Sequence, residues 1–324
     1  MKIVFVGPSA TNHRALLRAL DARGHEVAFL ERESVGELRE RFGELIADAD
    51  LAVVGSYIPD GVAVAELVLE CARGVTVFYD IDTPVTLAKL ERGDTEYLAP
   101  ELVPRFDLYL SSTGGQTLQV LEERWAARFA YAFYCFVDPD AYDVVQAERR
   151  WDLGYLGTYS GDRQPQVDEL LIAPAQRAPE FRFVVAGAHY PDTIEWPPNV
   201  ERRDHVPPAD QPAFCGSQRF TLNVTRADMR WLGWSPGMRL FEAAACGVPV
   251  ISDWWPGIDD IFSPGEEILL AESADDVLIF LDHCGDDEAA AIGERARRRV
   301  LAEHTAERRV QQLEALTGVS ARAG

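Results

Sequence analysis

The sequence predicts an α/β protein made of two doubly wound, Rossmann-like domains that face each other across a cleft. Its 324 residues suffice for two domains of about 150 residues each. Short apolar runs alternate with single helical segments, a pattern typical of parallel sheets with helices on both faces. The alternation starts again after residues 135–150, which have few sheet-like features and are interpreted as a linker.

In the first half, each apolar run is followed by a turn and a helical pattern. The first run turns at Gly7-Pro8-Ser9, Asn12 is a candidate cap for the next helix, and Gly24 ends that helix. By the same criteria we expect strands at 2–7, 26–31, 51–56, 75–80 and 107–112, and helices at 13–23, 35–47, 62–72 and 116–124.

The second half repeats the pattern. We expect strands at 152–160, 181–188, near Val200, and at 220–225, 248–253 and 266–271, with helices at 166–176, 238–246 and across most of 274–316. The predicted domains are therefore an N-terminal domain over 1–140 and a C-terminal domain over 150–303. A C-terminal helix and tail over 304–324 are expected to pack back on the N-terminal domain.

Composition and charge exclude several classes of protein. Apolar residues make up 47% of the chain and charged residues 26%, as in a soluble globular protein. No apolar run approaches the roughly 18–20 residues of a membrane span, and MKIVFVG enters a strand without a signal-peptide pattern, so we expect a cytoplasmic protein. The net charge of −22 argues against nucleic-acid binding.

Cysteine, histidine and basic residues narrow the interpretation further. The five cysteines form no CxxC pair, and the six histidines show no metal-ligand spacing, so a dedicated metal site is not expected. Of the 31 basic residues only Lys2 and Lys89 are lysine, and this bias toward arginine indicates a GC-rich bacterial genome.

The most informative stretch is 233–253, GWSPGMRLFEAAACGVPVISD. Ser235 and Gly237 favour a helix start with accessible backbone amides, which suits an anion, and Arg239 adds positive charge in the first turn. Glu242, one turn further, is suited to accept hydrogen bonds from the two vicinal hydroxyls of a ribose. The alternative is an ordinary helix–strand unit with a surface Glu–Arg pair.

This stretch resembles the C-terminal donor-binding motif of group 1 glycosyltransferases with the GT-B fold, EGFGxxxxEAMAxGxPVI. The resemblance implies that Glu242 holds the nucleotide ribose and that the region of Gly237 and Met238 contacts the diphosphate. Trp234 stands where the family has a first glutamate that contacts the donor sugar. The run RLFEAAACGVPVISDWWPGIDDIF is similar to the CgeB-like branch, named after a spore-maturation protein.

Other positions follow from the same resemblance. Arg163, in LGTYSGDRQP, is the counterpart of a basic residue that binds the pyrophosphate, and Gly187 matches a glycine near the base. His205 or Val206 is expected near the base as well. Arg226 ends a strand and is a second candidate phosphate ligand. Two arginines and a helix start would offset a diphosphate without a metal ion, unless both arginines are simply solvated.

In the N-terminal half, FYDIDTP places Asp80 and Asp82 at the end of a strand and at the expected rim of the cleft. Either carboxylate could stabilise an oxocarbenium-like transition state or deprotonate an acceptor hydroxyl. The alternative is an Asp pair that caps the turn. Related enzymes often have an HDxxP-type turn here, whose histidine touches the donor sugar.

Acceptor-side candidates follow the first strand, and they complete the predicted site: Ser9, Thr11, Asn12 and His13. The leading hypothesis is a metal-independent hexosyltransferase that uses a nucleotide diphosphate sugar, with UDP as the expected nucleotide, and an acceptor hydroxyl; retention of configuration is implied by the resemblance. The alternatives are a non-catalytic GT-B-like sugar-binding or scaffold protein, which Trp234 favours, and a nucleotide-sugar epimerase. Sugar, acceptor and oligomeric state stay open.

Overall fold

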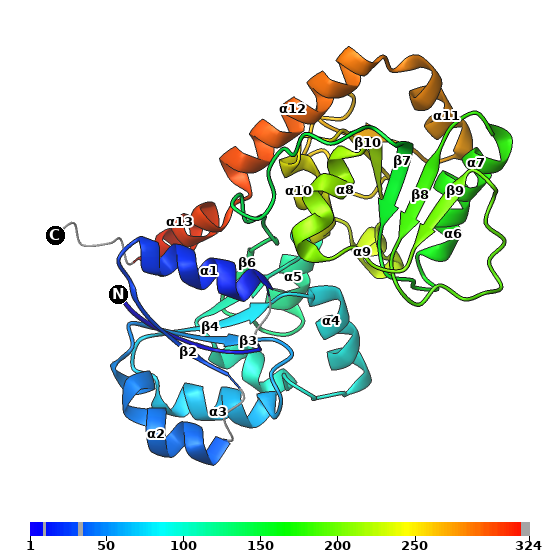
Figure 1. Cartoon of the computed structure of the whole chain (residues 1–324). Helices are drawn as coiled ribbons and strands as arrows, with labels where there is room; N and C mark the ends of the chain where they lie inside the picture. Colours follow the sequence, from blue (N-terminus) through cyan, green and yellow to red (C-terminus); the bar gives the residue numbers. More distant parts are fainter. Residues whose placement is uncertain (9–10, 32–34, 319–324) are drawn as a thin grey trace. The chain divides into compact units, whose positions relative to one another are not determined.

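The computed structural model describes residues 1–8, 11–31 and 35–318, and of residues 11 and 12 only the backbone. The chain divides into two units (Figure 1). Unit 1 contains Met1–Cys135, Leu232–Ser235 and the C-terminal segment from Ala306, and unit 2 contains Phe136–Trp231 and Pro236–Thr305. The short segment Leu232–Ser235 is therefore part of unit 1, which the sequence does not predict.

Unit 1 is built on a six-stranded parallel sheet of order β2-β1-β3-β4-β5-β6. Its first five strands confirm the sequence prediction, and β6 is additional. The strands are β1 (Lys2–Val6), β2 (Glu26–Leu30), β3 (Leu51–Gly55), β4 (Val75–Asp80), β5 (Leu108–Ser111) and β6 (Ala130–Ala132). Every residue of β3 is buried, as expected for a strand covered on both faces.

The helices of unit 1 include α4, which was not predicted from the sequence. They are α1 (Thr11–Ala22), α2 (Val35–Asp48), α3 (Gly61–Cys71), α4 (Thr83–Arg92), the 3-10 helix η1 (Pro100–Arg105), α5 (Gln116–Glu123) and α13 (Ala306–Thr317). We expected only a turn at Pro84, but α4 begins there, with Asp82 at its N-cap position and Pro84 in its first turn. Proline is tolerated in a first turn because its missing N–H has no intrahelical partner there.

Unit 2 contains a second six-stranded parallel sheet, of order β12-β11-β10-β7-β8-β9. This is the strand order of a Rossmann fold, as the sequence predicts. The strands are β7 (Trp151–Leu156), β8 (Phe183–Ala186), β9 (Val200–Arg203), β10 (Gln218–Asn223), β11 (Val250–Ser252) and β12 (Leu269–Leu270).

The helices of unit 2 cover both faces of its sheet. The predicted helix at 166–176 is one continuous segment with a π-helical middle: α6 (Gln164–Val167), η2 (Asp168–Ile172) and α7 (Ala173–Arg177). The others are η3 (Pro208–Asp210), α8 (Gln211–Gly216), α9 (Ala227–Leu232), α10 (Met238–Ala245), α11 (Ala274–His283) and α12 (Asp286–Glu303). Among the described residues, no helix is both long enough and apolar enough to cross a membrane.

The strand orders place one topological switch point in each unit. In unit 1 it lies between β1 and β3, since β1 pairs with β2 on its other side and β3 with β4. In unit 2 it lies between β7 and β10. Ligands of open α/β sheets bind beyond the carboxyl ends of the strands at such points. Functional residues are therefore expected at the carboxyl ends of the strands that flank each switch point.

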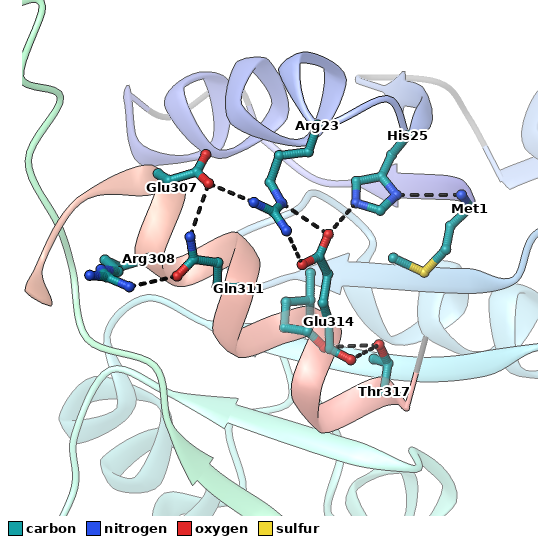
Figure 2. A network of polar contacts seen from close by, with 9 residues as sticks. Met1, Arg23, His25, Glu307, Arg308, Gln311, Glu314 and Thr317 are labelled. Atoms are coloured by element: carbon teal, nitrogen blue, oxygen red, sulfur yellow. Dashed lines mark hydrogen bonds and ion pairs between the residues drawn. The ribbon is translucent and has the colours of Figure 1, made fainter. Parts of the chain in front are cut away.

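The C-terminal helix α13 packs against α1 within unit 1 (Figure 1). Arg23, just after α1, donates to both carboxylate oxygens of Glu314 at 2.6 and 3.0 Å and to Glu307 at 2.7 Å (Figure 2). The buried His25 lies 2.8 Å from Glu314. The bond from Arg23, followed by that from His25, lowers the pKa of Glu314. A bidentate ion pair thus connects the two ends of the chain.

Candidate functional site

The switch point of unit 2 carries two of the predicted arginines. Arg163 stands at the N-cap position of α6 and donates to the carbonyl oxygen of Thr158 at 2.8 Å. Its Nε atom is buried and has no hydrogen-bond partner among the described residues. Arg226 follows β10, with its Nε atom 3.9 Å from the carboxylate of Asp162. The loops after β7 and β10 therefore bring both cations to one edge of the sheet.

Asp162 connects these two loops. Its carboxylate accepts from the backbone N–H of Ala227, at the start of α9, at 3.2 Å, and lies near Arg226. The side chain of Arg226 is 39% exposed and that of Asp162 33% exposed. Both side chains are thus accessible to solvent, and Asp162 offsets the positive charge of Arg226 only weakly.

Gly187 follows β8 in a backbone conformation that only glycine adopts readily. Its φ angle is 150°, and a Cβ atom there would lie 1.9 Å from the carbonyl oxygen of Gly157. The Gly187 N–H donates to the carbonyl oxygen of Arg203 at 2.8 Å. The glycine is required because the loops after β7 and β8 approach each other closely at this edge.

Glu242 lies on α10 and is buried, with 8% of its side chain exposed. One Nη atom of Arg239 lies 2.8 Å from its carboxylate and donates to the Gln211 side chain at 2.7 Å. Tyr142 donates to the same oxygen of Gln211 at 2.8 Å. Burial, and then the negative charge of Glu242, raise the pKa of Tyr142, so this tyrosine stays neutral. The predicted Glu–Arg pair forms, but its carboxylate is not at the surface.

The start of α10 differs from the prediction in one respect. Gly237 is the N-cap residue and Met238 the first helical residue, and no side chain caps the helix. Ser235 instead shares a 2.9 Å hydrogen bond with Thr113 in unit 1 and is buried. A Cβ atom on Gly237 would meet nothing within 4 Å, and Gly237, Met238 and Arg239 are half-buried, so the helix start is partly open to solvent.

Trp234 belongs to unit 1 and has a left-handed backbone, with φ 43°. Its carbonyl oxygen accepts from the N–H of Gly114 at 2.8 Å. Its ring lies against Gly115, where a Cβ atom would be 2.4 Å from the ring. The ring that replaces the family's first glutamate is therefore used for packing.

The predicted base contacts separate into an exposed and a buried residue. His205 is exposed in the loop after β9. Val206 is 5% exposed and packs in a small core cluster with Trp151 and Phe214. Because its side chain fills this cluster, a contact of Val206 with a base would have to be made by its backbone.

The two aspartates after β4 also differ. Asp80 is completely buried and does not lie at an exposed rim, contrary to the expectation. It accepts from Tyr109 at 2.7 Å, Thr86 at 2.8 Å and the N–H of Asp82 at 3.2 Å. Burial raises the pKa of Asp80 to about 6, although these bonds oppose the shift. Asp82 is half-buried and accepts from the Tyr57 hydroxyl at 3.0 Å.

The acceptor-side candidates are described only in part. Ser9 lies outside the described residues, and Thr11 and Asn12 lie in the first turn of α1. His13 is fully buried, with Nδ1 2.7 Å from the carbonyl oxygen of Pro8, and burial lowers its pKa. Its ring packs on Phe5. An exposed acceptor contact through the His13 side chain is therefore excluded.

Tyr57 follows β3 at the switch point of unit 1 and was not among the predicted site residues. Tyr57 is 39% exposed, its ring centroid lies 4.9 Å from that of Tyr97 with the two rings tilted by 41°, and its φ angle is 63°. Tyr57 is the second residue after β3, as Asp82 is after β4, so the criterion that selected Asp82 also selects Tyr57. Among the described residues, no three His, Cys, Asp or Glu side chains form a group that could hold a metal ion.

Comparison with known proteins agrees with this architecture. Residues 163–315 match the family model described as Glycosyl transferase-like, just under half of the chain. No curated protein matches the sequence. In fold, the chain is similar to sucrose-phosphate synthase from Thermosynechococcus elongatus, at 15% identity, coverage of 97% of both chains and a TM-score of 0.67.

Two further solved structures have the same fold. HepE of Anabaena in complex with UDP-glucose is 15% identical, with 98% of this chain and 100% of that chain covered and a TM-score of 0.66. The lipopolysaccharide outer core galactosyltransferase WaaB is 13% identical, with 98% and 99% covered and a TM-score of 0.66. The chain is thus similar to glycosyltransferases in sequence over residues 163–315, and along almost its whole length it has their two-domain, Rossmann-like GT-B fold.

Proposed function

We propose that this protein is a metal-independent, retaining hexosyltransferase of the CgeB-like branch, active in the bacterial cytoplasm with a UDP-sugar donor and an acceptor hydroxyl. The observation that carries the proposal is the pair of arginines at the switch point of unit 2. Arg163 and Arg226 lie within the segment that matches the family model. A diphosphate at this edge would gain charge-assisted hydrogen bonds from both.

The ribose site is proposed at Glu242. Its carboxylate is already oriented by Arg239, so it would accept from vicinal hydroxyls without further reorganisation. The accessible amides after Gly237 would add donors for the phosphates. HepE, similar in fold, has been solved with UDP-glucose, which supports UDP as the first nucleotide to test.

Metal independence is proposed because the arginines supply positive charge where the departing diphosphate needs it. In many enzymes of phosphate chemistry a divalent ion has that role. The catalytic carboxylate is proposed to be Asp82, since Asp80 is enclosed by Tyr109 and Thr86. The group that accepts a proton or balances the cationic transition state must reach the reacting atoms.

The experiment measures binding and turnover separately. Isothermal titration with UDP, GDP, ADP and uridine should show a nucleoside diphosphate bound at least about tenfold more tightly than the nucleoside. UDP-glucose and UDP-galactose should then release UDP, with and without EDTA, and NMR of the product gives its anomeric configuration. Absence of binding by every diphosphate overturns the proposal. Binding without nucleotide release would instead support a sugar-binding protein.

A further inference from the structure

Arg202 lies on β9 of unit 2 and was not among the predicted site residues. Its guanidinium faces two aromatic rings, with the Cζ atom 4.3 Å from the ring centroid of Tyr190 and 4.7 Å from that of Trp196. The two rings meet edge to face, with their centroids 5.4 Å apart. Burial lowers the pKa of Arg202, and a cation that has lost part of its water is attracted more strongly to ring faces. These three side chains form one cluster, which we call the Arg202 cluster.

The guanidinium of Arg202 also binds the backbone at the end of β8. It donates to the carbonyl oxygen of Val185 and, at 3.2 Å, to that of Gly187. Val185 pairs with Arg202 in the sheet, and Gly187 is the first residue after the strand. Because a guanidinium is planar and has five N–H donors, it bonds two carbonyl oxygens while its faces lie against rings. Arg202 therefore fixes the point at which the chain leaves β8.

The Arg202 cluster orders the connection between β8 and β9. Residues 187–199, all within the described part of the chain, contain neither a helix nor a strand. The connection is held instead by its aromatic residues, since Tyr190 and Trp196 pack on the core of unit 2. The Tyr190 hydroxyl donates to the carbonyl oxygen of Gly157 at 3.1 Å, so the same residue also contacts the loop after β7. Through Tyr190, Arg202 influences two neighbouring loops.

This connection starts at the edge of the sheet where the nucleotide is proposed to bind. Gly187, which the resemblance places near the base, donates its N–H to the carbonyl oxygen of Arg203 at 2.8 Å. Its own carbonyl oxygen accepts from Arg202. Because Gly187 has no side chain, the position of this backbone determines how closely a base can approach. Arg202 is the side chain that holds that position.

We propose that Arg202 is a positioning residue that holds residues 187–196 in the conformation that receives the nucleotide base. This inference rests on the proposed nucleotide-sugar function, to which it adds a residue that the resemblance does not supply. Arg202 acts through the carbonyl oxygen of Gly187 and the ring of Tyr190, without touching the nucleotide itself. Its loss should therefore weaken ligands that carry a base and spare a ligand that consists of the diphosphate alone.

The test compares two arginine variants of the full chain. Isothermal titration measures UDP binding, and competition with UDP measures the affinity for inorganic pyrophosphate. Arg202→Lys keeps the charge but loses the planar group, so it should weaken UDP binding about tenfold and leave pyrophosphate affinity within about twofold. The matched control is Arg203→Lys, because Arg203 is the next residue of β9 but lies over Trp151 at 4.7 Å and bonds the exposed Glu201 at 2.8 Å. The control should bind both ligands like the parent.

Two further measurements keep the test independent of a folding defect. In Arg202→Lys the amides of residues 188–196 should exchange hydrogen at least about tenfold faster than in the parent, while those of β10 and α12 stay unchanged. Tyr190→Phe is a milder variant, because it keeps the ring beside Arg202 and removes only the hydrogen bond to Gly157. It should weaken UDP binding about threefold. If Arg202→Lys does not fold, Tyr190→Phe decides with the same two ligands.

The contrary outcomes differ in where they are seen. The proposal is overturned if Arg202→Lys binds UDP as the parent does, or if UDP and pyrophosphate weaken by the same factor. Both of these results appear in the variant alone and leave the proposed function intact. If the parent itself binds no nucleoside diphosphate, the proposed function fails, and the role of Arg202 toward the base fails with it.

Discussion

The two parallel sheets differ in strand order, and the candidate site residues at their carboxyl edges have opposite charge. At the edge of unit 2, Arg163 and Arg226 follow the two central strands. At the edge of unit 1, Asp80 and Asp82 follow β4, and the aromatic Tyr57 follows β3. The contrast teaches that a parallel sheet supplies a place for a ligand, whereas loop residues decide which ligand it takes.

The two edges also share one feature, a buried aspartate. Asp253 follows β11 in unit 2 as Asp80 ends β4 in unit 1, and both are buried. Asp253 accepts from the N–H and hydroxyl of Thr225. Burial raises the pKa of each carboxyl to about 6. These two groups are thus expected to affect stability rather than ligand charge.

The largest expected effect is on the pH dependence of unfolding. Because the pKa of Asp80 is about 6 when folded and near 3.8 otherwise, the unfolded state ionises first as pH rises. The parent should therefore lose up to about 3 kcal/mol of stability between about pH 4 and 7 relative to Asp80→Asn. Urea unfolding of both proteins across that range measures the difference.

Asp253→Asn gives the matched measurement in unit 2 and should show the same sign. Parallel stability curves for the parent and both variants would mean that neither carboxyl is destabilised when ionised. If the pH dependence of stability differs from that of the parent in one variant only, the two buried aspartates are not equivalent.

The next effect is on turnover and tests the difference between Asp80 and Asp82. Asp82→Asn should lower the rate of nucleotide release about a hundredfold, the scale of one acid–base group, while UDP affinity holds. Asp48→Asn, an exposed carboxylate on α2, serves as the control. Full turnover in Asp82→Asn would show that the carboxylates at the edge of unit 1 have no catalytic role.

Glu242 tests whether the edge of unit 2 holds a ribose. Glu242→Ala should weaken UDP binding by about 1.5–3 kcal/mol, as expected for hydrogen bonds to a charged group. Isothermal titration measures this, with the exposed Glu294→Ala as the control. Since Arg239 also bonds Gln211, it keeps a partner in the variant, and unfolding should change little. Unchanged UDP affinity would show that the Glu242–Arg239 pair is only structural.

The smallest effect concerns the two arginines. Arg163→Ala and Arg226→Ala should each reduce the ratio of UDP to uridine affinity about fivefold to tenfold, since partly exposed charges contribute modestly. Arg177→Ala, on the exposed surface of α7, should leave the ratio as it is. If both variants discriminate UDP from uridine like the parent, the two arginines at the edge of unit 2 do not bind the diphosphate.

Local patterns in the sequence determined the fold class and most elements. Strands that are buried on both faces are continuous apolar runs, so β4 (VTVFYD) and β3 (LAVVG) could be predicted without tertiary information. The helix at Met238 was predicted to within one residue at each end because Gly237 precedes it and Gly247 follows it. α4 was missed because its proline was interpreted as a turn.

Only the tertiary structure decided which candidate side chains are accessible. Asp80 and Asp82 are two residues apart and so share the face of an extended strand, but the chain enters α4 there, and Tyr109 and Thr86 enclose only Asp80. Val206 was expected near the base by resemblance, and the structure places its side chain in a core cluster. Sequence periodicity reports which face of its own element a residue occupies, whereas burial depends on neighbours that are distant along the chain.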